Sequence, residues 1–427
     1  MGITRRSLIV LPAGAALAAA PALPAAAGRR ARPRPVIFIH GSAGSAMQFR
    51  IQAKRLAGNG YPIGIIEAHE YDSPNILTIL QQVYAGLDAR IERLLAASGA
   101  DRVDLLAHSL GTYVTQGYLN SSPERAARVA HYVNLDGRPA AALPGGVETL
   151  AIWGEGDPAR TVVGATNVYF PDQSHTQTVS SAESFREIHR FLRGRDASAR
   201  VTPTGVAHVS GRAVLFPSNA GVTDAVLEVH RVQASTGGRD RRVWRGPLGD
   251  GGTFGPIPLS PHDRYEFALI RAEQATHHFY FEPFRRSDSF VRLLTSRPGE
   301  GLGALVDTSD RHTALTFQRQ KEWWGGEGDN LWINGQDVLN PATAPHNRRI
   351  IGVFAFDDGV DGVSDLSAPL PEFIAQTFIS GVDLFIPSWH SGARTVSVVA
   401  RERGGGITKL PVPAWPSSEH RVSLEFG

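Results

Sequence analysis

Ser109 stands in a sequence setting that suits covalent catalysis. The segment Ala107-His108-Ser109-Leu110-Gly111 follows an apolar run at 103–106 and precedes a stretch with helical periodicity. A tight turn from a strand into a helix lifts a serine hydroxyl above the edge of a sheet, and small residues two positions before and after it let the two backbones approach. Here these residues are Ala107, where glycine is more usual, and Gly111. The pattern predicts a nucleophile at Ser109, with a helix-capping serine as the alternative.

The base expected to activate this serine is His175. A serine hydroxyl is a poor nucleophile until a base takes its proton, and that base needs an acid to orient it. On turns of this kind the chain order is serine, then acid, then histidine. His175 lies 66 residues after Ser109, in a polar loop just before the last helical segment of this half of the chain. The alternative is a solvated loop histidine.

The acid has two main candidates. Asp157 lies 48 residues after Ser109 and follows the apolar run 148–153, whereas Asp136 follows the earlier run 132–135. Strand order favours Asp157 as the partner of His175. Asp136 then lines the site or bonds backbone in a turn, and Glu155 is a third candidate.

The loop His40-Gly41-Ser42-Ala43-Gly44-Ser45 follows the first apolar run and is rich in glycine. An acyl-transfer site needs two backbone N–H groups aimed at the oxygen on which negative charge develops. Leu110, next to the nucleophile, supplies one such N–H, and the loop after the first strand supplies the other. We expect the N–H groups of Ser42 and Leu110 to form this oxyanion hole. A phosphate-binding loop is the alternative, but the lysine of such motifs is missing.

The region 35–194 alternates short apolar runs with helical periodicity, which predicts βαβ units and a parallel sheet. The expected strands are 36–39, 63–67, 103–107, 132–135, 148–153 and 167–170, and the expected helices are 46–56, 75–98, one from 110, and 182–192.

After Arg195 the helical periodicity ends and short β-rich runs follow, separated by Gly, Pro, Asn and Asp. This predicts an all-β region of the sandwich or barrel kind, in two subdomains. The predicted organisation is a leader at 1–27, a minimal α/β catalytic domain at 28–196, a β-sandwich subdomain at 197–295 and a second β-rich subdomain at 296–427.

The first 27 residues read as an export signal. Thr4-Arg5-Arg6-Ser7-Leu8-Ile9 matches a twin-arginine pattern, an Ala/Leu-rich stretch follows, and Ala25-Ala26-Ala27 fits a cleavage site. The formal net charge is +2, and it is near neutral without the leader, which gives no reason to expect nucleic acid as a partner. The chain has no cysteine, which excludes disulfides and thiolate metal sites. We expect a bacterial periplasmic or extracellular location.

Residues 35–194 resemble the bacterial and archaeal lipases of the α/β-hydrolase superfamily. The residues that carry this resemblance are the 40–45 loop, the 107–112 turn and the contexts of Asp157 and His175. The β region, with His277-His278-Phe279-Tyr280-Phe281-Glu282-Pro283-Phe284, is similar to the C-terminal β-domain of an archaeal long-chain lipase group. The resemblance implies ester hydrolysis through an acyl-serine intermediate, with no metal or cofactor.

The sequence therefore predicts a secreted serine carboxylic-ester hydrolase, a triacylglycerol lipase or esterase. Its partners are an ester or lipid substrate and, transiently, a lipid interface; the oligomeric state stays open. The short span from Ser109 to Asp157 leaves no room for a helical cap, so the β region is expected to cover the acyl-chain site. Two alternatives remain: a polyester or polyhydroxyalkanoate depolymerase whose β region binds polymer, and a non-catalytic surface-binding protein. Trp323, Trp324 and Trp332 lie either at the mouth of the site or in the β core.

Overall fold

The computed structural model describes residues 2, 32–390 and 392–426. Nearly all of the predicted leader, 1–27, lies outside the described residues. The chain divides into Met1–Pro33 and a compact unit at Arg34–Gly427, to which everything below refers. Within the described residues, no helix has the length and apolar character needed to cross a membrane.

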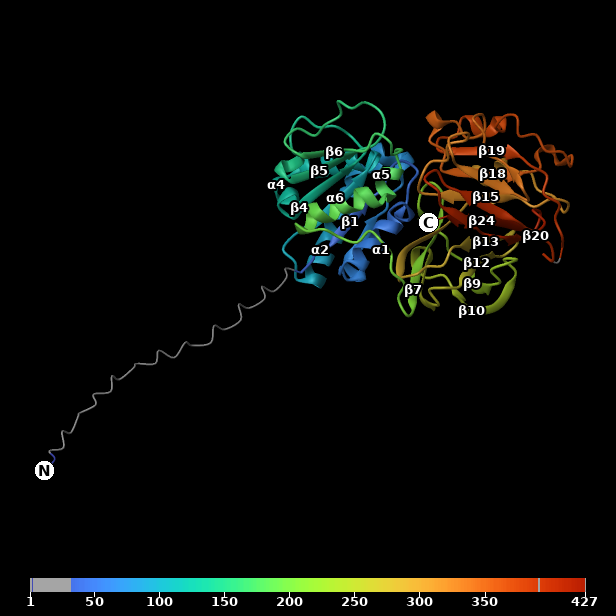
Figure 1. Ribbon diagram of the computed structural model, residues 1–427, viewed down its shortest axis with the longest axis horizontal. Helices are drawn as coiled ribbons and strands as arrows, with labels where there is room; N and C mark the ends of the chain where they lie inside the picture. Colours follow the sequence, from blue (N-terminus) through green and yellow to red (C-terminus); the bar gives the residue numbers. More distant parts are fainter. Residues whose placement is uncertain (1, 3–31, 391, 427) are drawn as a thin grey trace. The chain divides into compact units, whose positions relative to one another are not determined.

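The first half of the unit is built on a six-stranded parallel sheet, blue to green in Figure 1. Its order is β2-β1-β3-β4-β5-β6. The strands are β1 (Val36–Ile39), β2 (Ile66–His69), β3 (Val103–His108), β4 (Val129–Leu135), β5 (Glu148–Trp153) and β6 (Thr166–Tyr169). Because all pairs are parallel, the loops after these strands meet at one edge, where the predicted functional loops lie.

Helices cover both faces of this sheet. One apolar core packs α2 (Ile76–Ser98) and α3 (Leu110–Ser121) against it, and a second core packs α1 (Arg50–Gly58) and α6 (Ala182–Arg193) on the other face. Two short helices add to these cores: α4 (Pro123–Ala127) adds Ala126 to the first, and α5 (Gln177–Ser180) adds Val179 to the second. The predicted α/β class is confirmed. The second strand starts later than predicted, because Ile63–Ile65 form a 3-10 turn after Pro62.

The second half is built around an eight-stranded mixed sheet with the order β10-β9-β12-β13-β24-β15-β18-β19. These strands are β9 (Ala225–Val232), β10 (Arg239–Pro247), β12 (Arg264–Arg271), β13 (Thr276–Phe281), β15 (Leu315–Arg319), β18 (Gly352–Phe356), β19 (Ile379–Asp383) and β24 (His420–Phe426). Strand β24 lies between β13 and β15 and pairs with both in parallel. The sheet thus runs without a break across position 295/296, where the sequence predicts a boundary between two subdomains. That boundary stays a prediction.

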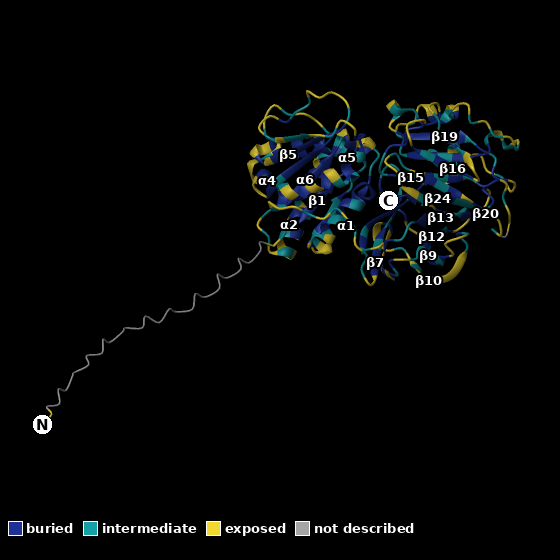
Figure 2. Ribbon diagram, in the orientation of Figure 1, coloured by how far each residue is buried: buried dark blue, intermediate teal, exposed yellow. Residues whose placement is uncertain are grey.

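Two smaller sheets pack against the eight-stranded sheet, so the region is a pair of sandwiches sharing one layer. The first contains β7 (Ala207–Leu215), β8 (Ala220–Gly221), β11 (Thr253–Leu259) and β14 (Asp288–Thr295), and it packs over the core that holds Phe267 and Phe279. The second contains β16 (Asn330–Ile333), β17 (Gln336–Asp337), β21 (Val398–Arg401) and β22 (Ile407–Lys409), over the core of Phe317 and Leu424. Buried residues run through the strands of both halves (Figure 2). A short helix, α7 (Pro371–Ile374), and the pair β20 (Thr395–Val396) and β23 (Val412–Pro413) lie outside these sheets.

Candidate functional site

Ser109 lies at the sharp turn between β3 and α3. Its backbone has φ 50° and ψ −121°, a conformation that costs a non-glycine residue free energy and that concentrates at functional turns. The turn is held by the Ser109 N–H, which donates to Leu135 O at 3.2 Å. Glycine is required at position 111, two residues after Ser109, because a Cβ at this position would lie 2.4 Å from Ile39 O. The absence of a side chain at Gly111 therefore lets α3 approach the end of β1.

His175 is buried and pairs with Asp136. The distance from His175 Nδ1 to Asp136 Oδ2 is 2.6 Å. An ionised carboxylate only accepts hydrogen bonds, so the proton lies on Nδ1 and Nε2 is left as the basic nitrogen. The other oxygen, Asp136 Oδ1, accepts from Gly154 N at 2.8 Å and from Arg160 Nη1 at 2.9 Å. Both carboxylate oxygens are thus fixed.

The charges around Asp136 keep it ionised. Burial alone would raise the pKa of this carboxyl. The hydrogen bond and charge of His175, the Gly154 N–H and the charge of Arg160 outweigh burial and hold the pKa below its ordinary value. At neutral pH the carboxylate therefore carries the charge that stabilises a protonated His175.

The prediction that Asp157 pairs with His175 is wrong. Asp157 is exposed, and its Oδ1 accepts from the N–H of Ala159 at 2.8 Å, within its own turn. Asp136 is nearer in the fold because it follows β4, the strand paired with β3, which ends at the Ser109 turn. The third candidate, Glu155, faces the β region, where its Oε2 lies 2.6 Å from His346 Nε2.

The 40–45 loop lies across the Ser109 turn. A Cβ on Gly41 would lie 3.0 Å from Ser109 Cβ, so the loop backbone passes close beside the serine. The loop is held from outside by Ala43 N, which donates to Ser73 Oγ at 2.8 Å. Among the described residues, none accepts a hydrogen bond from the N–H of Ser42, and none accepts from that of Leu110, the first residue of α3. Both N–H groups remain available to a ligand.

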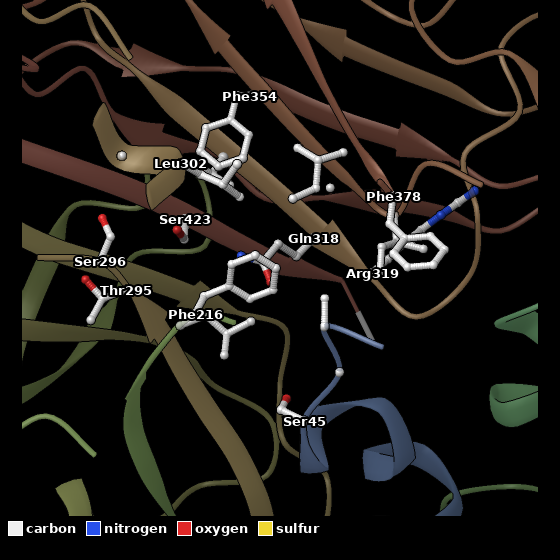
Figure 3. A pocket seen from close by; sticks show the side chains of 18 of the residues that line it. Ser45, Phe216, Thr295, Ser296, Leu302, Gln318, Arg319, Phe354, Phe378 and Ser423 are labelled. Atoms are coloured by element: carbon white, nitrogen blue, oxygen red, sulfur yellow. The ribbon is translucent and has the colours of Figure 1, made fainter. Parts of the chain in front are cut away.

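Ser42, Ser109 and His175 line one cavity of about 1410 Å³, a volume that includes its open mouth. Most of the remaining lining comes from the β region (Figure 3). The apolar lining residues of the β region are Phe216, Leu294, Leu302, Val306, Ala314, Ile351, Phe354, Phe378, Ile379 and Val422. The predicted role of the β region as the cover of the site agrees with this arrangement.

A glutamate of the β region holds the loop that carries His175. Glu322 has no exposed surface. Its Oε1 accepts the N–H of Thr176 at 2.7 Å, and its Oε2 accepts the hydroxyls of Thr176, at 2.7 Å, and of Ser174. The two residues that flank His175 are therefore both bound by one carboxylate. Sequence reasoning missed Glu322, since the neighbouring Trp323-Trp324 pair was the only signal in that segment.

Arg403 extends the same contact. Its Nη2 donates to Ser174 Oγ and to Gln177 Oε1, both at 3.0 Å, and its Nη1 donates to Asp329 Oδ2 at 2.5 Å. Trp324 stacks under this guanidinium, with 3.7 Å from Cζ to the ring centre. Trp323 is fully buried in the core of the second sandwich, and neither tryptophan lines the cavity.

Glu70 makes a second contact between the two halves, next to the 40–45 loop. Its Oε1 accepts Ala46 N at 2.8 Å and Arg292 Nε at 2.8 Å, and its Oε2 accepts Arg212 Nη1 at 3.1 Å. Burial alone would raise the pKa of Glu70, but the charge and hydrogen bonds of Arg292 outweigh it and lower the pKa to about 2. Glu70 thus gives the β region a second attachment to the first half of the unit.

The described residues contain no group of three or more His, Asp or Glu side chains arranged to hold a metal ion.

Two family models of lipases match parts of the chain. The model described as lipase (class 2) matches residues 33–122, and the lipase C-terminal domain model matches residues 205–298. A third model, of a C-terminal domain, matches residues 301–427. No curated protein matches the sequence.

The solved structures to which the chain is similar are distant from it in sequence. Lipase B of Aspergillus fumigatus is 14% identical, with 40% of this chain and 55% of that chain covered and a TM-score of 0.31. A hydrolase of Thermoplasma acidophilum is 16% identical, with 39% and 88% covered and a TM-score of 0.28. Phospholipase PlaB of Legionella pneumophila is 10% identical, with 61% and 93% covered and a TM-score of 0.26. The chain thus spans about half the length of the fungal lipase. The parallel α/β sheet and the two lipase models thus make the chain similar to lipases of the α/β-hydrolase fold with a C-terminal β region.

Proposed function

We propose that the chain is a serine hydrolase of lipid esters in which Ser109 is the nucleophile, His175 the base and Asp136 the acid that orients it. The pairing of His175 Nδ1 with Asp136 Oδ2 at 2.6 Å carries the proposal, because it leaves Nε2 basic in the cavity that Ser109 also lines. The strained turn at Ser109 supports the same assignment.

The reaction follows from these positions. His175 Nε2 takes the hydroxyl proton while Ser109 Oγ attacks the ester carbonyl, and the N–H groups of Ser42 and Leu110 bind the oxyanion. His175 then returns the proton to the leaving alcohol, and an acyl-serine remains. A water molecule, deprotonated by His175, releases the carboxylic acid and restores Ser109.

A lipid acyl chain suits the cavity better than a polymer does. The apolar residues of the β region line the same cavity as Ser109, which supports a bound hydrocarbon chain rather than a separate polymer-binding surface. The position of these side chains around the space is visible for Phe216, Leu302 and Phe354 in Figure 3.

The test is hydrolysis of p-nitrophenyl esters from acetate to palmitate by the wild type and by Ser109→Ala. We expect activity that rises with acyl length and disappears in Ser109→Ala. An acyl-enzyme trapped during turnover and located at Ser109 by mass spectrometry would identify the nucleophile directly. Activity that survives Ser109→Ala would refute the assignment.

We also propose that the protein is exported by the twin-arginine route. The support is the sequence pattern of residues 4–27, which lie outside the described residues. Expression in a bacterial host should give an extracytoplasmic product that lacks the leader. Replacing Arg5 and Arg6 by lysine should leave the precursor in the cytoplasm, and export of that variant would contradict the proposal.

A further inference from the structure

The cavity wall carries positive charge and no negative charge. Among the described residues that line it, none is Asp or Glu, whereas two are arginines, Arg319 and Arg421. Arg319 is neutralised, because its Nη2 donates to Asp329 Oδ2 at 2.7 Å. A neutral triacylglycerol gives no reason for a further cation in the wall of its binding site, so Arg421 needs an explanation.

Arg421 has no carboxylate partner within the described residues. It lies on β24, and its Nη1 donates to Ser296 Oγ at 3.0 Å. Burial lowers its pKa, and no acidic group among the described residues raises it. Gly303 closes over this side chain, since a Cβ there would lie 2.7 Å from Arg421 Nη1. The guanidinium is therefore held in place with hydrogen-bonding capacity left over.

A second guanidinium, that of Arg271, donates to the same serine as Arg421, Ser296. Arg271 is only 8% exposed, and its Nη1 and Nη2 donate to Ser296 O and Thr295 Oγ1, at 3.0 and 3.1 Å. Its Nε is buried and has no hydrogen-bond partner among the described residues. Burial and the charge of Arg421 lower the pKa of Arg271, and again no carboxylate contributes. Two like charges brought together without an acid cost folding free energy, which is typical of a site prepared for an anion.

The side chains around Arg421 are hydroxyls and an imidazole. Thr295, Ser296 and Ser423 line the cavity, and the first two lie side by side opposite Arg319 and Phe378 (Figure 3). His277 links them: its Nδ1 lies 3.1 Å from Thr295 Oγ1 and its Nε2 lies 2.8 Å from Ser423 Oγ. Hydroxyl donors next to guanidinium groups are the groups that bind carboxylate and phosphate oxygens.

We propose that the cavity end formed by Arg421, Ser296 and Thr295 binds an oxyanion, a carboxylate or a phosphate, on the same ester molecule that Ser109 attacks. The proposal rests on the proposed function and deepens it: the preferred substrate is an ester with one negatively charged group besides the ester. Arg271 positions Thr295 and Ser296 through its hydrogen bonds to them.

The first experiment compares p-nitrophenyl monoesters of α,ω-dicarboxylic acids with the same compounds capped as methyl esters, over a range of chain lengths. At the matching length we expect kcat/KM to be larger for the anionic ester. Arg421→Gln should lower the anionic-to-neutral ratio of kcat/KM roughly ten- to hundredfold, the effect of losing one charge-assisted hydrogen bond. Arg421→Lys should restore part of the ratio, and added NaCl should reduce the ratio in the wild type.

Arg401→Gln is the matched control. Arg401 is an exposed residue of β21 in the same region, so its replacement changes the net charge equally and should leave the ratio unchanged. A fall in the ratio with Arg401→Gln would show that net charge, rather than the site, produces the preference, and would overturn the proposal.

A second arm distinguishes the two sources of the oxyanion. Fatty-acid release is compared for lysophosphatidic acid and for the monoacylglycerol with the same acyl chain, in neutral detergent micelles. An Arg421-dependent preference for the phosphate compound assigns the anion to the leaving alcohol. An Arg421-dependent preference confined to the dicarboxylic monoesters assigns it to the acyl chain. The absence of both preferences overturns the proposal.

Binding to Ser109→Ala separates this proposal from the proposed function. Calorimetric titration with sebacate and with lysophosphatidic acid should give an affinity that falls about tenfold or more when Arg421→Gln is added. Arg421-dependent binding together with a wild type inactive on every ester would refute the proposed function and keep the anion site. Ester hydrolysis without Arg421-dependent binding would keep the proposed function and refute the anion site.

Discussion

The carboxylate of Glu322 accepts the backbone N–H of Thr176, the residue directly after His175, at 2.7 Å. Glu322 belongs to the β region and has no exposed surface, so the loop of the proposed base is positioned by the other half of the chain. The two halves are therefore coupled at the site itself, and the hydrolase half does not hold His175 with its own contacts alone.

Glu322→Ala should lower kcat about ten- to hundredfold with a smaller change in KM. The substitution leaves the buried Thr176 N–H without an acceptor, and a small displacement of His175 weakens proton transfer. Steady-state kinetics on a soluble p-nitrophenyl ester measure the split. The low-field proton resonance of the His175–Asp136 hydrogen bond should also shift or broaden.

Glu322→Gln and Asp337→Asn are the comparisons for this variant. Gln keeps an oxygen for the Thr176 N–H and should recover most of kcat. Asp337 accepts Leu331 N at 3.0 Å in the second sandwich, away from the His175 loop. If Asp337→Asn matched the kcat loss of Glu322→Ala at equal loss of melting temperature, the role of Glu322 would be one of general stability.

Asp136→Asn should lower kcat by about 10⁴-fold, because an amide stabilises the wrong tautomer of His175 and supplies no charge to its protonated form. Asp157→Asn should stay within a factor of about two of the wild type, since the Asp157 side chain lies in an exposed turn, where its Oδ1 accepts the N–H of Ala159. Kinetics of both variants on one ester decide between the two acids. A large loss in Asp157→Asn with an active Asp136→Asn would reverse the assignment.

Gly111→Ala should destabilise the protein by about 1–3 kcal/mol and reduce activity. The added methyl would lie 2.4 Å from Ile39 O, so α3 must move away from β1 and take the Ser109 turn with it. Urea unfolding measures the first effect. Gly58→Ala is the control, since a Cβ there meets nothing within 4 Å. Equal unfolding free energies for both variants would contradict this account.

Acid should separate the two halves through Glu70 and Asp288. Asp288 Oδ2 bonds to Arg50 Nε at 2.5 Å and Lys54 Nζ at 3.0 Å, and their charges outweigh burial and lower its pKa to about 2, as Arg292 does for Glu70. Both pKa values are depressed by folding. The stability that these groups contribute is therefore complete above the unfolded pKa, near 4 to 4.5, and is lost as the pH falls toward 2.

Urea unfolding between pH 6 and about pH 2 tests this point. In Glu70→Gln the decline in stability over that interval should be shallower than in the wild type. Glu300→Gln, which removes an exposed carboxylate 3.6 Å from Arg297, should leave the decline unchanged. Identical curves for Glu70→Gln and the wild type would show that Glu70 is not a source of the acid sensitivity.

The parts of the site that depend on local pattern could be predicted from the sequence. Helical periodicity at 75–98 and the apolar run at 148–153 correspond to α2 and β5 almost residue for residue. The Ser109 turn needs only a strand, small residues and a helix in succession, and these are visible in one dimension. His175 could be predicted for the same reason, because it is a loop histidine after the last strand of this half.

The parts of the site that depend on packing between distant segments could not be predicted from the sequence. Asp136 and Asp157 both follow strands, and only the path of the β5–β6 loop decides which of them reaches His175. Glu322 lies 146 positions from Thr176 in the chain, and no periodicity relates them. Arg421 reads as an ordinary charged strand residue until β24 is placed in the middle of a sheet.

The position of β24 also dictates an order of events during synthesis. The strands β13 and β15 are both made long before residues 420–426, yet β24 separates them in the finished sheet. The eight-stranded sheet therefore cannot close until residues 420–426 have been made, and the wall that bears Arg421 and Ser423 forms only then. The hydrolase half can assemble first, but the cavity is completed only when β24 pairs with β13 and β15.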